Sequence, residues 1–104
     1  MLAHNVFFAL KDKAQAPALV ASCRKYLTDH PGIMFFACGT VAEGLERPVN
    51  VRDWDVALHI VFDNRASHDV YQDAPRHHQF VAENREGWAL VRVFDSTVEG
   101  SARS

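Results

Sequence analysis

The order of strand and helix patterns along this chain constrains its fold most strongly. Four apolar stretches have the pattern of strands: some alternate between two faces, as in half-buried strands, and the second is apolar on both faces at residues 34–38. These stretches are residues 2–10, 33–41, 54–62 and 88–98. Helical spacing fills the regions after the first and the third of them. The order β-α-β-β-α-β predicts the ferredoxin-like split βαβ form of an α+β fold, with a four-stranded antiparallel sheet and the helices on one face.

Caps and breakers delimit the two helical regions. Pro17 fits the first turn of a helix, and the breaker residues around Pro31 end that helix. Asn64 can cap a second helix from about residue 65 to 72, and Pro75 begins a third. No linker, repeat or low-complexity segment divides the pattern, so we expect residues 1–104 to form one domain.

The sheet face opposite the helices is predicted to be apolar, although a face in contact with water should be mostly polar. The apolar residues assigned to it are Phe7, Ala9, Ala57, Val61, Ala89, Val91 and Val93. A soluble monomer rarely exposes so large an apolar surface, so we expect a second copy to cover it as a homodimer. The alternative cover is a lid made by the longest loop, residues 42–52, and the C-terminal tail. That loop contains few apolar residues, which favours the homodimer.

Composition argues against several classes of function. The chain has 11 basic and 13 acidic side chains, a net charge of -2 and no basic patch, so no nucleic-acid partner is expected. No apolar run could span a membrane, and the first residues do not resemble a signal peptide. Two cysteines, Cys23 and Cys38, are too few for a disulfide framework. We expect them to be free thiols in a reducing, cytoplasmic location.

Tyr71 and His77 flank the predicted helix break at Pro75. A neutral imidazole can take a proton from carbon next to a carbonyl, and a phenol in a dry pocket can stabilise the developing oxyanion. His4 lies on the helix-facing side of the first strand, so we expect these three side chains to converge. The predicted apolar lining of their cavity is Val6, Leu58 and Phe80.

A purely structural reading of the same three residues remains open. The hydroxyl of Tyr71 could bond to a nearby carbonyl, and His77 could cap backbone groups around the proline. His4 could be a core histidine bonded to Tyr71 or His77. An open cavity that contains these side chains would favour an enzyme or ligand-binding protein, whereas a filled core would favour a structural role.

No metal or cofactor site is predicted. His77 and His78 are adjacent on a helix and point about 100° apart, which makes them poor common ligands. His30 and His68 belong to different elements and share no spacing motif typical of zinc sites. The glycines form no phosphate-binding loop, and no serine occurs in a nucleophile elbow.

Six short segments occur in an order and spacing typical of one protein family. They are His4 with Val6 and residues 8–12, residues 31–33 with Gly39, residues 54–58, Phe62 with Asp63, residues 71–77 with Phe80, and residues 93–96. On these segments the chain resembles the stress-responsive A/B barrel (Dabb) family over nearly its whole length. The resemblance implies a dimeric α+β barrel that is stress-associated or binds a small hydrophobic molecule, without established catalysis.

One branch of that family resembles a cofactor-independent plant polyketide cyclase, which implies an alternative function. By position, the tyrosine and two histidines of that enzyme match Tyr71, His77 and His4, so the resemblance implies aldol-type cyclisation or isomerisation. Two further histidines of the cyclase have no counterpart, because this chain has Val56 and Ala74 there.

Overall fold

The computed structural model describes residues 1–101, and its elements follow the predicted order. The elements are β1 (Leu2–Leu10), η1 (Lys13–Gln15), α1 (Ala16–Tyr26), β2 (Ile33–Thr40), β3 (Val56–Phe62), α2 (Arg65–Asp73), α3 (Pro75–Asn84), η2 (Arg85–Gly87) and β4 (Trp88–Thr97). The strands form one antiparallel sheet in the order β2-β3-β1-β4. This arrangement confirms the predicted ferredoxin-like α+β fold. Within residues 1–101, every helix is too short or too polar to cross a membrane.

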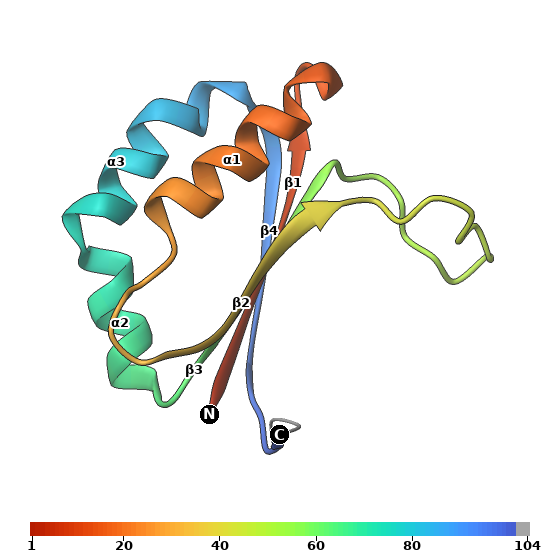
Figure 1. The fold of residues 1–104 in the computed structure, drawn as a ribbon. Coiled ribbons are helices and arrows are strands. Elements are labelled where there is room, and N and C mark those ends of the chain that lie inside the picture. The colour runs from red at the N-terminus through yellow and green to blue at the C-terminus, as the bar shows by residue number, and fades with distance from the viewer. Residues whose placement is uncertain (102–104) are drawn as a thin grey trace.

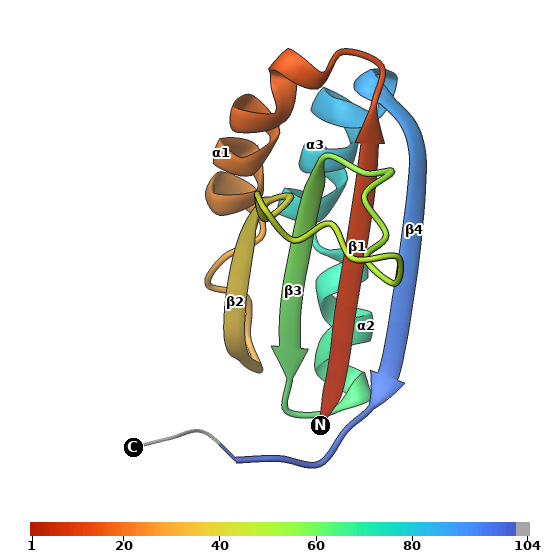
Figure 2. The same cartoon turned by 90° about the vertical axis from the view of Figure 1, so that its right-hand side faces the viewer.

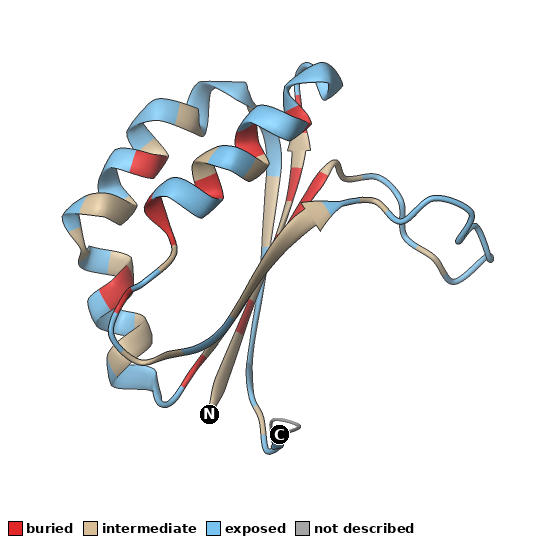
Figure 3. Cartoon of the chain, in the orientation of Figure 1, coloured by how far each residue is buried: buried red, intermediate tan, exposed pale blue. Residues whose placement is uncertain are grey.

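The molecule has two layers. Figure 1 shows the sheet edge-on, with α1, α2 and α3 on one side and the loop between β2 and β3 projecting from the other. In Figure 2 the helix-free face is toward the viewer, and this loop passes in front of the sheet. Buried residues lie where the helices and the sheet face each other (Figure 3). The least exposed large side chains are Tyr71, Phe62, Leu27, Leu58, Ile60, Val56 and Cys23.

The break between α2 and α3 has a local cause in the sequence. The side chain of Asn64 accepts a hydrogen bond from the backbone N–H of Ser67 and starts α2, as predicted. Ala74 has an extended backbone, with ψ of 142°, because a residue that precedes a proline avoids the helical region. Pro75 then occupies the first turn of α3. The two helices are therefore separate elements that meet at Ala74.

Strand β4 presents different side chains to the helices than predicted. Residues directly opposite each other in an antiparallel pair lie on the same face of the sheet. Val91 is opposite Phe8, and Val93 is opposite Val6, which is buried under the helices. Both valines therefore lie on the helix-facing side, and their assignment to the helix-free face was wrong.

A β-bulge explains this inversion. Leu10 pairs with Trp88, whereas its neighbour Ala9 pairs with Leu90, so Ala89 is an additional residue in β4. One additional residue moves every later side chain to the opposite face of the sheet. The residues that β4 contributes to the helix-free face are Leu90, Arg92, Phe94 and Ser96.

Strand β3 begins later than predicted, and this changes the position of a tryptophan. Trp54 precedes the strand, which starts at Val56. The indole Nε1–H of Trp54 donates a hydrogen bond to the carbonyl of Val51, at 2.8 Å. Its ring packs edge-on against Phe7, with 5.1 Å between the ring centroids. Since Phe7 is on the helix-free face, Trp54 lies there too, whereas a strand that began at residue 54 would place it on the helix-facing side with Val56.

Candidate functional site

A cavity of about 160 Å³ lies between the sheet and the helices α2 and α3. Its lining includes all six residues that the sequence analysis assigned to a site: His4, Tyr71, His77, Val6, Leu58 and Phe80. Seven further residues complete it: Phe8, Leu27, Gln72, Val81, Trp88, Val91 and Val93. Most of these side chains are apolar, and the few polar groups come from β1 and from the two helices at the break. Such a combination is typical of small-molecule sites.

The helix break brings Tyr71 and His77 together. Tyr71 lies in the last turn of α2 and His77 in the first turn of α3, and their ring centroids are 4.9 Å apart at an interplanar angle of 73°. The backbone N–H of Ala74 donates to the carbonyl of Tyr71 at 3.2 Å and closes the junction. The rings are therefore held together by a short segment of fixed backbone.

His4 is paired with a carboxylate that the sequence analysis did not identify. Asp95 lies directly opposite His4 in the β1–β4 ladder, and its Oδ1 atom is 2.5 Å from Nδ1 of the imidazole. A carboxylate at this distance accepts the Nδ1–H, so the lone pair of the neutral imidazole is on Nε2. The Nε2 atom of Gln72 is 3.5 Å from Nε2 of His4. Of His4, Tyr71 and His77, only His4 is thus shown with a carboxylate partner among the described residues, and this partner fixes the tautomer of the imidazole.

Burial controls the protonation state of both histidines. It lowers the pKa of His4, and the hydrogen bond and charge of Asp95 partly oppose this effect. For His77, burial together with four neighbouring histidines lowers the pKa to about 4. The Nδ1 atom of His77 is buried and has no hydrogen-bond partner within residues 1–101, so it does not cap the backbone around Pro75. At neutral pH the His77 imidazole is uncharged and can bond to a ligand.

Tyr71 supplies the complementary group. Its ring is almost fully buried against Phe62 and His30, with 5.1 Å between ring centroids in each case. Burial, with a smaller effect of the nearby Cys23, raises the pKa of the phenol above its usual value. The hydroxyl therefore stays protonated near neutral pH and can donate a hydrogen bond to a ligand oxygen.

The other histidines and the cysteines lie outside this group. His30 bonds through Nε2 to the carbonyl of Tyr26 at 2.7 Å, His59 bonds to Asn5 at 2.7 Å, and His78 lies 3.3 Å from Asp73. Both cysteines are free, as expected. Burial raises the pKa of the Cys23 thiol to about 12, so this thiol is not a nucleophile at neutral pH.

Two signals in the sequence could have identified the residues that were missed. The first and last strands of a split βαβ fold are adjacent and antiparallel, so a residue near Asp95 must face His4. His68 and Gln72 are i and i+4 on one helix and share the face that carries Tyr71. His68 lies beside His4, with 5.1 Å between their ring centroids.

Comparison with known proteins gives a family match and a set of similar folds. The model of the stress responsive A/B barrel domain family (Dabb) matches residues 2–98. No curated protein matches the chain in a sequence search. Among solved structures, a dimeric ferredoxin-like protein of unknown function from Thermobifida fusca is 21% identical with a TM-score of 0.76, and the alignment covers 93% of this chain and 90% of that one.

Two other solved structures extend the comparison. A Dabb family protein with a ferredoxin-like fold from Mesorhizobium loti is 20% identical with a TM-score of 0.76, over 95% of this chain and 97% of that one. The hydroxynitrile lyase from Passiflora edulis is 16% identical with a TM-score of 0.75, over 98% of this chain and 96% of that one. At these identities the likeness establishes the fold, and the similar proteins differ in function.

Proposed function

Because the chain belongs to the stress responsive A/B barrel (Dabb) family, we propose that it is a homodimer that binds a small, largely apolar carbonyl compound in the cavity between the sheet and α3. The observation that carries this proposal is that Tyr71 and His77 both line one apolar cavity, while the Nδ1 atom of His77 is buried without a hydrogen-bond partner in the described residues. A buried polar atom without a partner costs about 1–3 kcal/mol. A ligand that bonds to it removes that cost.

The size of the cavity limits the ligand. At about 160 Å³ the space within one chain is smaller than the roughly 300–1,000 Å³ of drug-sized sites. A short ketone or β-diketone suits a space of this size better than a long polyketide chain.

A second candidate function is proton transfer on the bound carbonyl compound, as in isomerisation or aldol cyclisation. The pairing of His4 with Asp95 favours it, because a histidine held in one tautomer by a carboxylate is a typical general base. In this scheme Nε2 of His4 takes a proton from the carbon next to the carbonyl, and the resulting negative charge is delocalised to the oxygen. The Tyr71 hydroxyl donates a hydrogen bond to that enolate oxygen. The proton returns from His4 to carbon or oxygen, so the enzyme is regenerated.

In this scheme His77 forms a hydrogen bond to the ligand and does not act as the general base. A general base is most effective when its pKa is near the working pH, and the pKa of His77 is about 4. Its neutral imidazole suits hydrogen bonding to the ligand better than removal of a proton from carbon. The His4–Asp95 pair is therefore the proposed base, with Tyr71 and His77 as hydrogen-bonding partners.

The proposed dimer uses the helix-free face. Large apolar side chains on this face are exposed in the single chain, among them Phe35 (56%) and Phe94 (57%). Phe7, Trp54 and Phe94 form a continuous aromatic group, with centroid distances of 5.1 and 5.8 Å from Phe7 to the other two rings. The projecting β2–β3 loop has exposed Val49 and Val51, at 76% and 63%. A second copy would cover both features, and similar proteins are described as dimeric.

Hydrogen–deuterium exchange tests binding and proton transfer together. The wild-type protein is mixed with acetylacetone or a small methyl ketone in D₂O, and ¹H NMR follows both line broadening of the ligand and loss of its α-proton signal. We expect saturable binding and exchange faster than in buffer. Tyr71→Phe should slow exchange at least tenfold, and the matched control His78→Asn, on the exposed side of α3, should not change it.

A substitution that fills the cavity distinguishes binding inside the cavity from binding elsewhere on the surface. Val93 lines the cavity and is half exposed, so Val93→Phe can fill its mouth without overpacking the core. It should abolish binding, whereas Val70→Phe, outside the cavity on α2, should not. Binding without exchange would leave a ligand-binding protein that lacks the proposed catalysis. Absence of binding by any of these ketones would contradict the whole proposal.

A further inference from the structure

His68 belongs to a second group of side chains around His4, which does not include Tyr71 or His77. One possible ligand atom each from His4, His68 and Asp95 lies within 4.8 Å of the other two. The three residues come from β1, α2 and β4, so the fold itself brings them together. Two imidazoles and one carboxylate form a ligand set that proteins use for divalent transition metals with open coordination positions.

The hydrogen bonding of His68 is that of a metal ligand. Its Nδ1 atom lies 3.0 Å from Oδ1 of Asp69, and its Nε2 atom is buried without a hydrogen-bond partner in the described part of the chain. Histidines that bind a metal usually donate their other N–H to a carboxylate or carbonyl, which orients the free lone pair toward the ion. The side chain of His68 is 15% exposed, so its Nε2 atom has lost water without gaining a protein partner.

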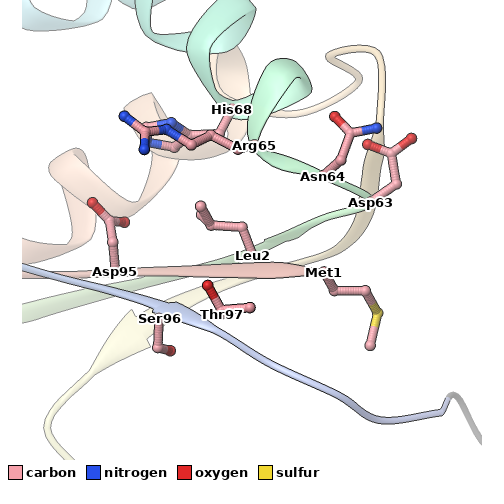
Figure 4. A pocket seen from close by; sticks show the side chains of 9 residues that line it. All are labelled: Met1, Leu2, Asp63, Asn64, Arg65, His68, Asp95, Ser96 and Thr97. Carbon is pink, nitrogen blue, oxygen red and sulfur yellow. The ribbon is translucent and has the colours of Figure 1, made fainter.

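Solvent reaches this group through a large open cavity. The cavity has a volume of about 550 Å³ and includes His68 and Asp95 in its lining, together with Met1, Leu2, Asp63, Asn64, Arg65, Ser96 and Thr97. Figure 4 shows His68 descending from α2 on one side and Asp95 rising from β4 on the other. Arg65, whose side chain is positively charged, also lines this cavity and is paired with Asp69 at 3.8 Å. Water can therefore complete the coordination of an ion held here.

We propose that His4, His68 and Asp95 bind one divalent transition-metal ion, such as Zn²⁺, with water in the remaining positions. Imidazole favours zinc, cobalt, nickel and iron over magnesium and calcium, which prefer oxygen ligands. At metal–ligand distances of about 2.0–2.2 Å, ligand atoms are about 3 Å or more apart. Binding therefore draws His68 inward and replaces the hydrogen bond of 2.5 Å between His4 and Asp95. The single proton of the neutral His4 imidazole then moves from Nδ1 to Nε2, so that Nδ1 can bind the metal.

This site goes beyond the carbonyl-binding cavity and can fail independently of it. The two share His4, but His68 does not line the carbonyl-binding cavity, and Tyr71 and His77 take no part in the metal site. The tests below use metal ions alone and no carbonyl compound. If the wild-type protein binds no metal, the ketone experiments can still succeed. If it binds no ketone, the metal titrations can still succeed.

Titration with Co²⁺ and Zn²⁺ tests the proposal on the untagged protein after treatment with a chelator. Calorimetry should give one site per chain with micromolar or tighter affinity, and Mg²⁺ should not compete at millimolar concentration. Co²⁺ should produce visible absorption bands that Zn²⁺ removes. Affinity should fall as the pH is lowered, because protons compete with the metal for the ligand atoms.

Variants assign the ligands. His68→Ala and Asp95→Asn should each weaken Co²⁺ binding at least tenfold, whereas His78→Ala, which removes an exposed histidine, should leave it unchanged. Paramagnetic shifts of the imidazole signals in the wild-type protein give a reading that does not depend on how the variants fold: Co²⁺ should shift His4 and His68 strongly and His59 weakly. Absence of one-to-one binding, equal affinity in His68→Ala, or strong shifts only at other histidines would overturn the assignment.

Discussion

The imidazole of His4 and the carboxylate of Asp95 are 2.5 Å apart, although 91 positions separate the two residues in the sequence. The ladder between β1 and β4 places them directly opposite each other on the helix-facing side of the sheet. Asp95 favours the protonated imidazole, whereas burial favours the neutral one, and burial has the larger effect on the pKa of His4. Asp95 and burial thus have opposite effects on the pKa of His4, and a variant that removes one of them can be measured.

Asp95→Asn should lower the pKa of His4 still further. The amide removes the negative charge and the charge-assisted hydrogen bond, which are the two effects that raise this pKa, and leaves the burial that lowers it. NMR titration of the imidazole signals measures the shift. Asp53→Asn is the matched control, since Asp53 is an exposed aspartate on the surface that bonds to Arg92. An unchanged His4 pKa in Asp95→Asn would mean that the carboxylate has no influence on the imidazole.

The free energy of unfolding should decrease as the pH falls from about 6.5 toward 4. The pKa of His77 is about 4 in the folded protein and 6.5 as its ordinary value, so between these values the unfolded chain binds a proton that the folded chain excludes. Protonation therefore favours the unfolded state between about pH 4 and 6.5. Above about pH 6.5, His77 is neutral in both states and no longer lowers the free energy of unfolding. Urea denaturation across this pH range measures the slope.

His77→Gln should make that slope shallower, because glutamine does not titrate. His78→Gln is the control on the same helix, and its slope should match that of the wild type. Equal slopes for wild type and His77→Gln would show that the His77 imidazole is charged or accessible in the folded state.

Gly32→Ala should destabilise the protein by about 2–4 kcal/mol, more than Gly44→Ala. Both glycines have positive φ, at 84° and 79°, which costs any other residue about 1–2 kcal/mol. At Gly32 an added Cβ would also meet the Cβ of Ser67 at 2.4 Å, whereas nothing lies within 4 Å of it at Gly44. Urea denaturation of the two variants isolates the steric contribution. Equal losses would show that the start of β2 and the first turn of α2 can move apart freely.

Phe94→Asp should dissociate the proposed homodimer, because it places an unpaired carboxylate in an apolar interface. The dissociation constant should rise at least about 100-fold, equivalent to about 3 kcal/mol. Sedimentation equilibrium should show a species near twice 11.7 kDa for the wild type and a monomer for the variant. Val70→Asp, at a similarly exposed position on the helix side, should remain dimeric. A monomeric wild-type protein at micromolar concentration would rule out the dimer.

The sequence was sufficient for those features that depend on periodicity and strong local signals. Alternation and helical spacing predicted the order of the elements, Asn64 predicted the start of α2, and Pro75 predicted the break beside Tyr71. The position of His4 on the helix-facing side followed from the same alternation. These signals are repeated over many residues, or use side chains whose backbone preferences are strong, so tertiary packing did not override them.

Features that depend on single irregularities or on distant pairing were not predicted. One additional residue at Ala89 reversed the faces of the rest of β4, and alternation alone cannot locate such a bulge. Trp54 has strand-like neighbours, yet its indole bonds to Val51 and packs on the opposite face of the sheet. The contact between His4 and Asp95 needs the exact register of two strands from opposite ends of the fold.

The adjacency of β1 and β4 also has a consequence for the order of events during synthesis. Leu2 pairs with Thr97, so the first strand of this fold to be synthesised obtains its last partner when almost all residues of the fold have been made. At about 5–20 residues per second, β1 spends several seconds with one edge unpaired. Folds dominated by such distant contacts form slowly, and unpaired strand edges are prone to aggregate. In nascent chains, the edge of β1 that later pairs with β4 therefore remains open to contact with other chains until β4 has been synthesised.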